Sequence, residues 1–78
     1  MDLKQLRYFI TVAEEGTISA AAKRLFMSQP PLSTQMKLLE SELGCPLFER
    51  GQKHIRLTET GRLLYDRAQT RLRNDSSL

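Results

Sequence analysis

The side chains with the clearest functional potential in this sequence lie between residues 28 and 41. Their chemistry is hydrogen bonding to a ligand rather than catalysis. They recur at helical spacing on one side of the segment, with Gln29 at its N-terminal tip: Pro30, Ser33, Thr34, Lys37 and Ser41. Short amides and hydroxyls can approach base edges closely, and a helix N-terminus favours a nearby phosphate. The alternative is an ordinary solvent face, although such faces usually carry long Glu and Lys side chains. The pattern favours recognition of nucleic acid.

Basic side chains gather in the second part of the chain. Residues 1–44 carry five Lys or Arg and five Asp or Glu, whereas residues 45–73 carry seven basic side chains against three acidic ones. The whole chain has a net charge of +3 and a pI near 9.4. Such a cluster attracts polyanions, and phosphate contacts supply most non-specific affinity for DNA. Arg50 and Lys53 are the best candidates for phosphate or groove contacts; a surface loop with incidental charge is the alternative.

Other kinds of chemistry lack the residues that they need. Cys45 is the sole cysteine and His54 the sole histidine, so neither an internal disulfide nor a zinc site can be assembled. We interpret Cys45 as a small apolar filler rather than a redox sensor. No carboxylate pair, nucleophile–base set or glycine-rich phosphate loop is available, so we expect no enzyme, metal or cofactor. No apolar run approaches the roughly 20 residues of a membrane span, and a cytosolic protein is expected.

Two helices are expected before the polar segment. Apolar residues at helical spacing predict a first helix that supports the core: Leu3, Leu6, Ile10 and Ala13. Asp2 is suited to begin this helix and Gly16 to end it. A second helix is expected near residues 20–26, with Thr17 and Ser19 as candidate caps.

The polar segment itself is predicted to be a third helix that follows a tight turn. Met27 and Ser28 form the turn, Ser28 is a plausible cap, and Gln29 is biased away from helix by the proline after it. Gly44 ends the helix. The apolar stripe of this helix consists of Leu32, Met36, Leu39 and Leu43. Leu38 falls beside the polar face, where it either packs on a neighbouring element, touches a thymine methyl group or is exposed.

The remainder predicts a basic hairpin and a last helix. Residues 47–50 and 55–57 read as two short strands whose Phe48, Ile55 and Leu57 point inward, an arrangement typical of a wing that reaches the DNA backbone or minor groove. Thr58 is a good N-cap for a helix that begins at Glu59. This helix is expected to project beyond the core, so that its apolar stripe needs a partner: Leu64, Ala68 and Leu72.

These blocks, in this order, resemble the N-terminal DNA-binding domain of LysR-type transcriptional regulators. The resemblance extends from Leu3 to about Leu72 and rests on Leu6-Arg7-Tyr8-Phe9, Ala21-Ala22 with Leu25, Ser28-Gln29-Pro30-Pro31-Leu32-Ser33 with Gln35, Leu39-Glu40, Glu42-Leu43-Gly44, Leu47-Phe48-Glu49-Arg50, and Leu57-Thr58-Glu59 with Gly61. It implies a mainly α fold, with a winged helix-turn-helix over residues 1–58 and a long linker helix over residues 59–78.

The resemblance also implies partners and site residues. Major-groove contacts carry over to Gln29, Pro30, Pro31, Ser33, Thr34 and Lys37, and wing contacts carry over to Arg50 and Lys53. Thr34 stands where relatives often have arginine, so a site tolerant of A/T pairs is plausible. Linker helices pairing through Leu64, Ala68 and Leu72 imply a homodimer on an interrupted inverted repeat, and tetramers of the full-length protein. A C-terminal domain that senses a small molecule is expected outside this chain, in a cytoplasmic, nucleoid-associated protein.

A protein-interaction module is the competing hypothesis. Winged helices can bind proteins with the same surface, and Leu38 could belong to such a patch. The basic wing and the polar helix face argue against it, because a docking face would be more apolar.

Overall fold

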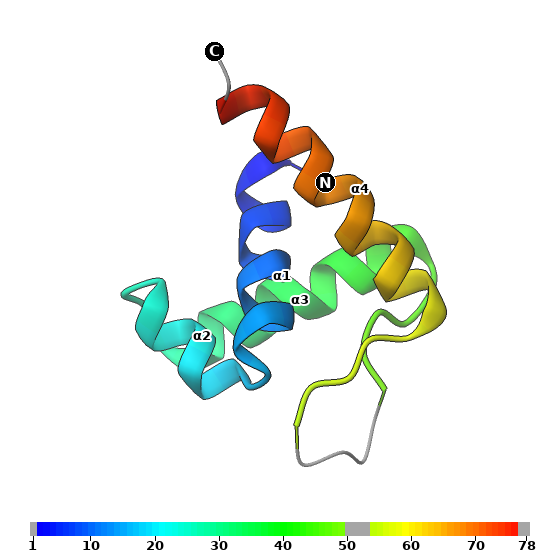
Figure 1. The fold of residues 1–78 in the computed structure, drawn as a ribbon. Helices are drawn as coiled ribbons and strands as arrows, with labels where there is room; N and C mark the ends of the chain where they lie inside the picture. The colour runs from blue at the N-terminus through cyan, green and yellow to red at the C-terminus, as the bar shows by residue number, and fades with distance from the viewer. Residues whose placement is uncertain (1, 50–53, 77–78) are drawn as a thin grey trace.

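The structure is a computed structural model, and it describes residues 2–49 and 54–76, with side chains as far as Leu72. Four helices make up these parts of the chain (Figure 1): α1 (Leu3–Glu15), α2 (Ile18–Arg24), α3 (Gln29–Leu43) and α4 (Glu59–Ser76). The mainly α class predicted from the sequence is confirmed. None of the described helices is long and apolar enough to cross a membrane.

Side chains at the predicted positions begin three of these helices. Asp2 Oδ1 accepts a hydrogen bond from the Gln5 N–H at 2.8 Å, and Thr17 Oγ1 accepts one from the Ala20 N–H at 3.1 Å. Thr58 Oγ1 accepts one from the Gly61 N–H at 3.0 Å. Each bond satisfies a backbone donor that the first turn of a helix leaves without an internal partner.

The turn between α2 and α3 differs from the sequence prediction. Helix α2 ends at Arg24 rather than at Phe26, because Phe26 adopts a left-handed conformation with φ of 56°. The Phe26 N–H donates to the Lys23 carbonyl at 3.2 Å, and the Met27 N–H donates to the Ala22 carbonyl at 3.0 Å. This pair of bonds is the Schellman motif, which satisfies the last carbonyls of a helix and reverses the chain.

Helix α3 begins directly after the predicted cap position, Ser28. Gln29 is its first residue, so the proline that follows does not exclude Gln29 from the helix. Ser28 occupies the cap position with an extended backbone, but its side chain makes no capping hydrogen bond. Gly44 ends α3 in a left-handed conformation with φ of 74°, as Gly16 ends α1 with φ of 83°.

The two predicted wing strands are reduced, in the described residues, to one isolated antiparallel bridge between Phe48 and Leu57. The Glu49 N–H donates to the Arg56 carbonyl at 2.8 Å beside this bridge. As predicted, Phe48, Ile55 and Leu57 pack partly buried against the core. The described residues therefore contain this single bridge and no extended strand.

The core lies where α1 is covered by the other three helices. Phe9 and Val12 of α1, Leu32 and Leu39 of α3, and Leu47 after α3 are all fully buried. The Phe9 and Phe48 rings are tilted at 45° with centroids 5.6 Å apart, a favourable aromatic arrangement. This cluster joins the segment after α3 to the centre of the fold.

Helix α4 corrects a prediction. The sequence suggested a projecting helix with an uncovered stripe, but α4 packs along α1 (Figure 1). Ala68 is only 2% exposed, and Leu64 and Leu72 are partly buried against the core. Sequence spacing could not distinguish these cases, because an apolar stripe looks the same whether its partner is in the same chain or in a second one.

Candidate nucleic-acid interface

Most residues of the polar face of α3 are exposed. Leu32, Met36 and Leu39 face the core. The predicted contact residues lie away from that stripe: Gln29, Pro30, Pro31, Thr34 and Lys37 are exposed, and Ser33 is half-buried. Residues three or four apart share a helix face, so Pro30, Ser33, Thr34 and Lys37 lie on one face of α3, and Gln29 and Pro31 lie beside Pro30 in its first turn.

A shallow hollow lies between α2 and the start of α3. It is lined by Ser19, Ala22, Lys23, Met27, Ser28, Gln29 and Pro30. The hollow offers hydroxyl groups and one ammonium group beside the positive end of α3, a combination that suits a phosphate. The sequence predicts Ser19 and Ser28 only as caps; their shared place in this hollow depends on how α2 crosses α3.

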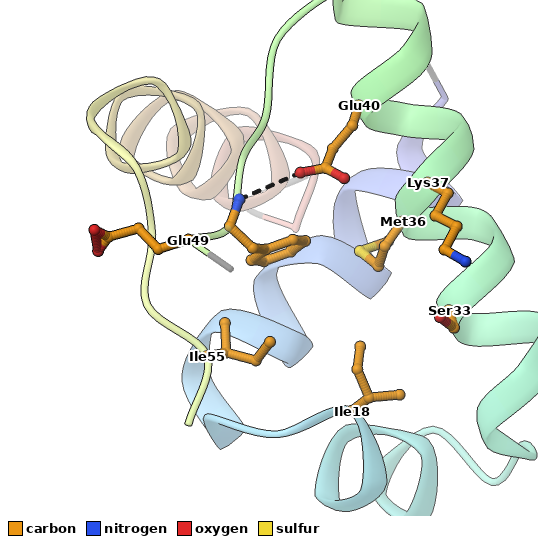
Figure 2. A pocket seen from close by; sticks show the side chains of 8 residues that line it. Ile18, Ser33, Met36, Lys37, Glu40, Glu49 and Ile55 are labelled. Atoms are coloured by element: carbon orange, nitrogen blue, oxygen red, sulfur yellow. Dashed lines mark hydrogen bonds between the residues drawn. The ribbon is translucent and has the colours of Figure 1, made fainter. Parts of the chain in front are cut away.

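A second hollow of about 260 Å³ separates α3 from the base of the wing. Ser33, Met36, Lys37 and Glu40 of α3 line it with Ile18, Phe48, Glu49 and Ile55 (Figure 2). Figure 2 shows the Glu49 side chain pointing away from the hollow. Two predicted contact residues, Ser33 and Lys37, therefore lie at its α3 side.

Charged side chains lie before and after residues 50–53, the part of the wing that falls outside the described residues. The predicted contacts Arg50 and Lys53 fall in that region. His54 and Arg56 are exposed after it. Arg56 Nε lies 3.8 Å from Glu49 Oε2, and both side chains are largely exposed, so this ion pair contributes little to stability.

Arg24 is engaged within the chain rather than presented to a ligand. Its Nη1 donates to Glu14 Oε1 at 2.8 Å and to Glu15 Oε2 at 3.2 Å. These two carboxylates raise the pKa of the Arg24 guanidinium. The other oxygen of Glu14 accepts a hydrogen bond from the Tyr65 hydroxyl at 3.2 Å, and Gln69 Nε2 donates to that hydroxyl at 2.9 Å. A chain of polar contacts thus connects α2, α1 and α4.

Two large apolar residues of the helix-turn-helix segment are exposed, Leu38 on α3 and Phe26 in the turn before it. Leu38 is 51% exposed, in agreement with the exposed alternative named for it. Phe26 is 97% exposed, and sequence analysis missed it because it placed Phe26 at the end of a helix. The signal that could have predicted this exposure was the position of Phe26, a large apolar residue between the two helices of a helix-turn-helix pattern.

The predicted dimerisation residues differ in what they can offer. The Leu64 and Leu72 side chains are partly exposed to solvent, whereas Ala68 is buried within its own chain. The uncovered stripe that motivated the prediction therefore does not exist in this form, although pairing through α4 stays a prediction. Leu63, on the outer side of α4, is 55% exposed. Among the described residues no group of His, Cys, Asp and Glu could hold a metal ion.

These elements define a helix-turn-helix domain: two crossed helices, a tight turn, and a second helix that presents a polar face. The sequence pattern of the bacterial regulatory helix-turn-helix proteins of the LysR family matches residues 3–62. The chain belongs to this family.

Similar proteins agree with that membership. BsdA of Bacillus subtilis (strain 168), an HTH-type transcriptional regulator, is 55% identical over 69 residues, which are 87% of this chain and 24% of BsdA. ClcR of Pseudomonas putida, another such regulator, is 56% identical over 61 residues, which are 78% of this chain and 21% of ClcR. The chain thus spans about a quarter of the length of these relatives. Both relatives are transcriptional regulators.

Solved structures match the whole described fold. The complex of BenM_DBD with catB site 1 DNA matches with a TM-score of 0.96 at 43% identity, over 99% of this chain and 86% of that one. The CbnR_DBD–DNA complex matches with a TM-score of 0.92 at 45% identity, over 99% of this chain and 88% of that one. CbnR, a LysR family transcriptional regulator, matches with a TM-score of 0.91 over 99% of this chain and 27% of that one.

Proposed function

We propose that this chain is the DNA-reading domain of a bacterial LysR-type transcription regulator and binds double-stranded DNA sequence-specifically. The observation that carries the proposal is the fit of 99% of the chain, at a TM-score of 0.96, onto a domain solved in complex with DNA. The exposed polar face of α3 supports it, because short hydrogen-bonding side chains can enter a major groove.

The finer assignments follow from this proposal. Gln29, Pro30, Pro31, Ser33, Thr34 and Lys37 contact the major groove, and Arg50 and Lys53 of a wing contact the backbone or minor groove. Residues 1–58 form the winged helix-turn-helix and residues 59–78 the linker helix.

Two copies pair through α4, where Leu64, Leu72 and the exposed Leu63 offer apolar surface, and read an interrupted inverted repeat. The full-length protein forms tetramers, senses a small molecule with a further domain, and acts in the cytoplasm at the nucleoid.

Selection of bound sequences from random duplex DNA at near-physiological salt tests the proposal. Enrichment of an interrupted inverted repeat is the expected result, and enrichment of a single half-site would indicate a monomeric reader. A bound pool without sequence preference, whose binding vanishes as salt rises, would contradict sequence-specific reading. That result would favour a protein-interaction module, for which the exposed Phe26 and Leu38 supply the apolar surface.

A further inference from the structure

Glu40 of α3 directs its carboxylate to the backbone of the segment that follows the helix. Its Oε2 atom accepts hydrogen bonds from the Leu47 N–H at 2.7 Å and from the Phe48 N–H at 3.3 Å, and Figure 2 draws the second of these bonds as a dashed line. Leu47 is fully buried, so its N–H would lack water if this carboxylate were absent. A carboxylate that receives two backbone donors binds them more strongly than a neutral acceptor would.

The peptide at Leu47 is also held from the side of α4. Its carbonyl accepts a hydrogen bond from the Thr58 N–H at 3.0 Å, and the Thr58 hydroxyl donates to the Pro46 carbonyl at 2.8 Å. Gly61 packs so closely on the Leu47 carbonyl that a Cβ at this position would collide with it. Residues 46–48 are therefore fixed between α3 and the start of α4.

These contacts determine where the wing leaves the core. The Phe48–Leu57 bridge and the bond from the Glu49 N–H to the Arg56 carbonyl form the base of the wing directly after the clamped peptide. On the other side of this base the Ile55 N–H donates to the Gly16 carbonyl at 2.6 Å. Glu40 thus joins the helix that carries the polar face to the base that carries the wing.

The negative charge of Glu40 distinguishes a positioning role from a simple effect of charge on DNA binding. Glu40 lines the same hollow as Ser33 and Lys37, beside the face that we assign to DNA. A carboxylate close to phosphates weakens binding through repulsion. On charge alone, its removal should therefore strengthen binding, whereas loss of a positioning contact should weaken it.

We propose that Glu40 is a positioning residue for DNA binding, which holds the base of the wing at Phe48 and Glu49 beside α3 without touching DNA. The proposal rests on the proposed function and adds a residue that the sequence analysis did not assign to the interface. It predicts that the contribution of Glu40 to affinity is transmitted through the wing residues Arg50 and Lys53.

The first experiment compares Glu40→Gln with Glu42→Gln in duplex binding at several salt concentrations. Both substitutions remove one negative charge from α3, and Glu42 is exposed. We expect Glu42→Gln to bind as tightly as the wild type or more tightly. Glu40→Gln should bind about tenfold more weakly, as for a coupled contact. Its salt slope should flatten by about one to two, because each lost phosphate contact removes about 0.9. Preference for the bases read by α3 should remain.

A double-mutant cycle separates positioning from a general structural role. In an Arg50→Ala/Lys53→Ala background, Glu40→Gln should cause no further loss of affinity, because the contacts that it positions are already absent. In the protein that carries Glu40→Gln alone, the loss of affinity should be accompanied by faster hydrogen exchange of the Leu47 and Phe48 amides. Circular dichroism checks the fold. If Glu40→Gln does not fold, Glu40→Asp is compared with Glu42→Asp, since both keep the negative charge and shorten the side chain.

Two outcomes would overturn the proposal: equal affinity and salt slope for Glu40→Gln and Glu42→Gln, or an undiminished loss in the background without the wing residues. The wild-type chain serves as the reference for both. Failure of the wild type to select any duplex would instead contradict the proposed function, so the two failures are distinguishable.

Discussion

Helices α3 and α4 carry apolar stripes of similar spacing, yet they have different places in the molecule. The stripe of α3 is buried at Leu32, Met36 and Leu39, and its opposite face offers short polar groups. The stripe of α4 is closed by α1 around Ala68, and the outer side of α4 mixes exposed Leu63 with basic residues. In both helices the apolar stripe marks the side that faces the core. The opposite faces differ: that of α3, for which we propose DNA reading, is short and polar, whereas that of α4 is mixed apolar and basic.

Gly61→Ala should produce the largest change and tests how closely α4 approaches the segment before it. In an open helix this substitution would stabilise by about 1 kcal/mol, because Ala is the better helix former. Here the added Cβ meets the Leu47 carbonyl, so we expect destabilisation by about 3 kcal/mol instead. Urea unfolding measures the difference, and any gain in stability would show that the close approach is wrong.

Ala68→Leu tests the closure of α4 on α1. Ala68 is 2% exposed, and overpacking at such a site should cost about 2 kcal/mol of unfolding free energy. Arg67→Leu, at an exposed position of α4, is the control and should change stability by less than about 0.5 kcal/mol. Thermal unfolding measures stability and sedimentation measures oligomeric state. If Ala68→Leu left the free energy of unfolding unchanged, α4 would not pack closely on α1. It would then project from the core, as the sequence predicted.

Gln29→Ala tests the reading role of α3. The side chain is exposed, so stability should stay within about 0.5 kcal/mol of the wild type. Affinity for the selected site should fall by about 1–2 kcal/mol if one base contact is lost. Titrations with the selected duplex and with random duplex provide the measurement. Equal losses on both would place Gln29 on the backbone rather than on a base.

Tyr65→Phe should give the smallest effect and tests the polar contacts between α4 and α1. Loss of the hydrogen bond to Glu14 should cost about 0.5–1 kcal/mol. Burial, together with the nearby Glu14 carboxylate, raises the pKa of the Tyr65 hydroxyl above its ordinary value of 10.0. The neutral phenol is therefore favoured by folding, and its contribution is present below about pH 10 and lost as pH rises through the raised pKa.

Unfolding measured between pH 8 and pH 11 checks this sign. The wild type should lose its advantage over Tyr65→Phe at the alkaline end. A difference that does not depend on pH would mean that the hydroxyl makes no contact sensitive to its charge.

Much of the fold could be predicted because its signals are local. Asp2, Thr17 and Thr58 each cap a helix within three residues, and Gly16 and Gly44 end helices through their own backbone freedom. The members of the polar face of α3 also follow from spacing along one helix. The end of α2 was missed because the left-handed Phe26 contradicts the preference of its residue type.

Local sequence was sufficient to determine the helices, their caps, and the residues that share a face of α3, since each depends on neighbours within a turn or two. Packing in three dimensions decided the rest. Tyr65 meets Glu14 across 51 positions of sequence, Glu40 reaches the backbone beyond its own helix, and α1 covers Ala68. Such contacts depend on how helices cross, and the crossing is chosen by the whole core rather than by any one segment.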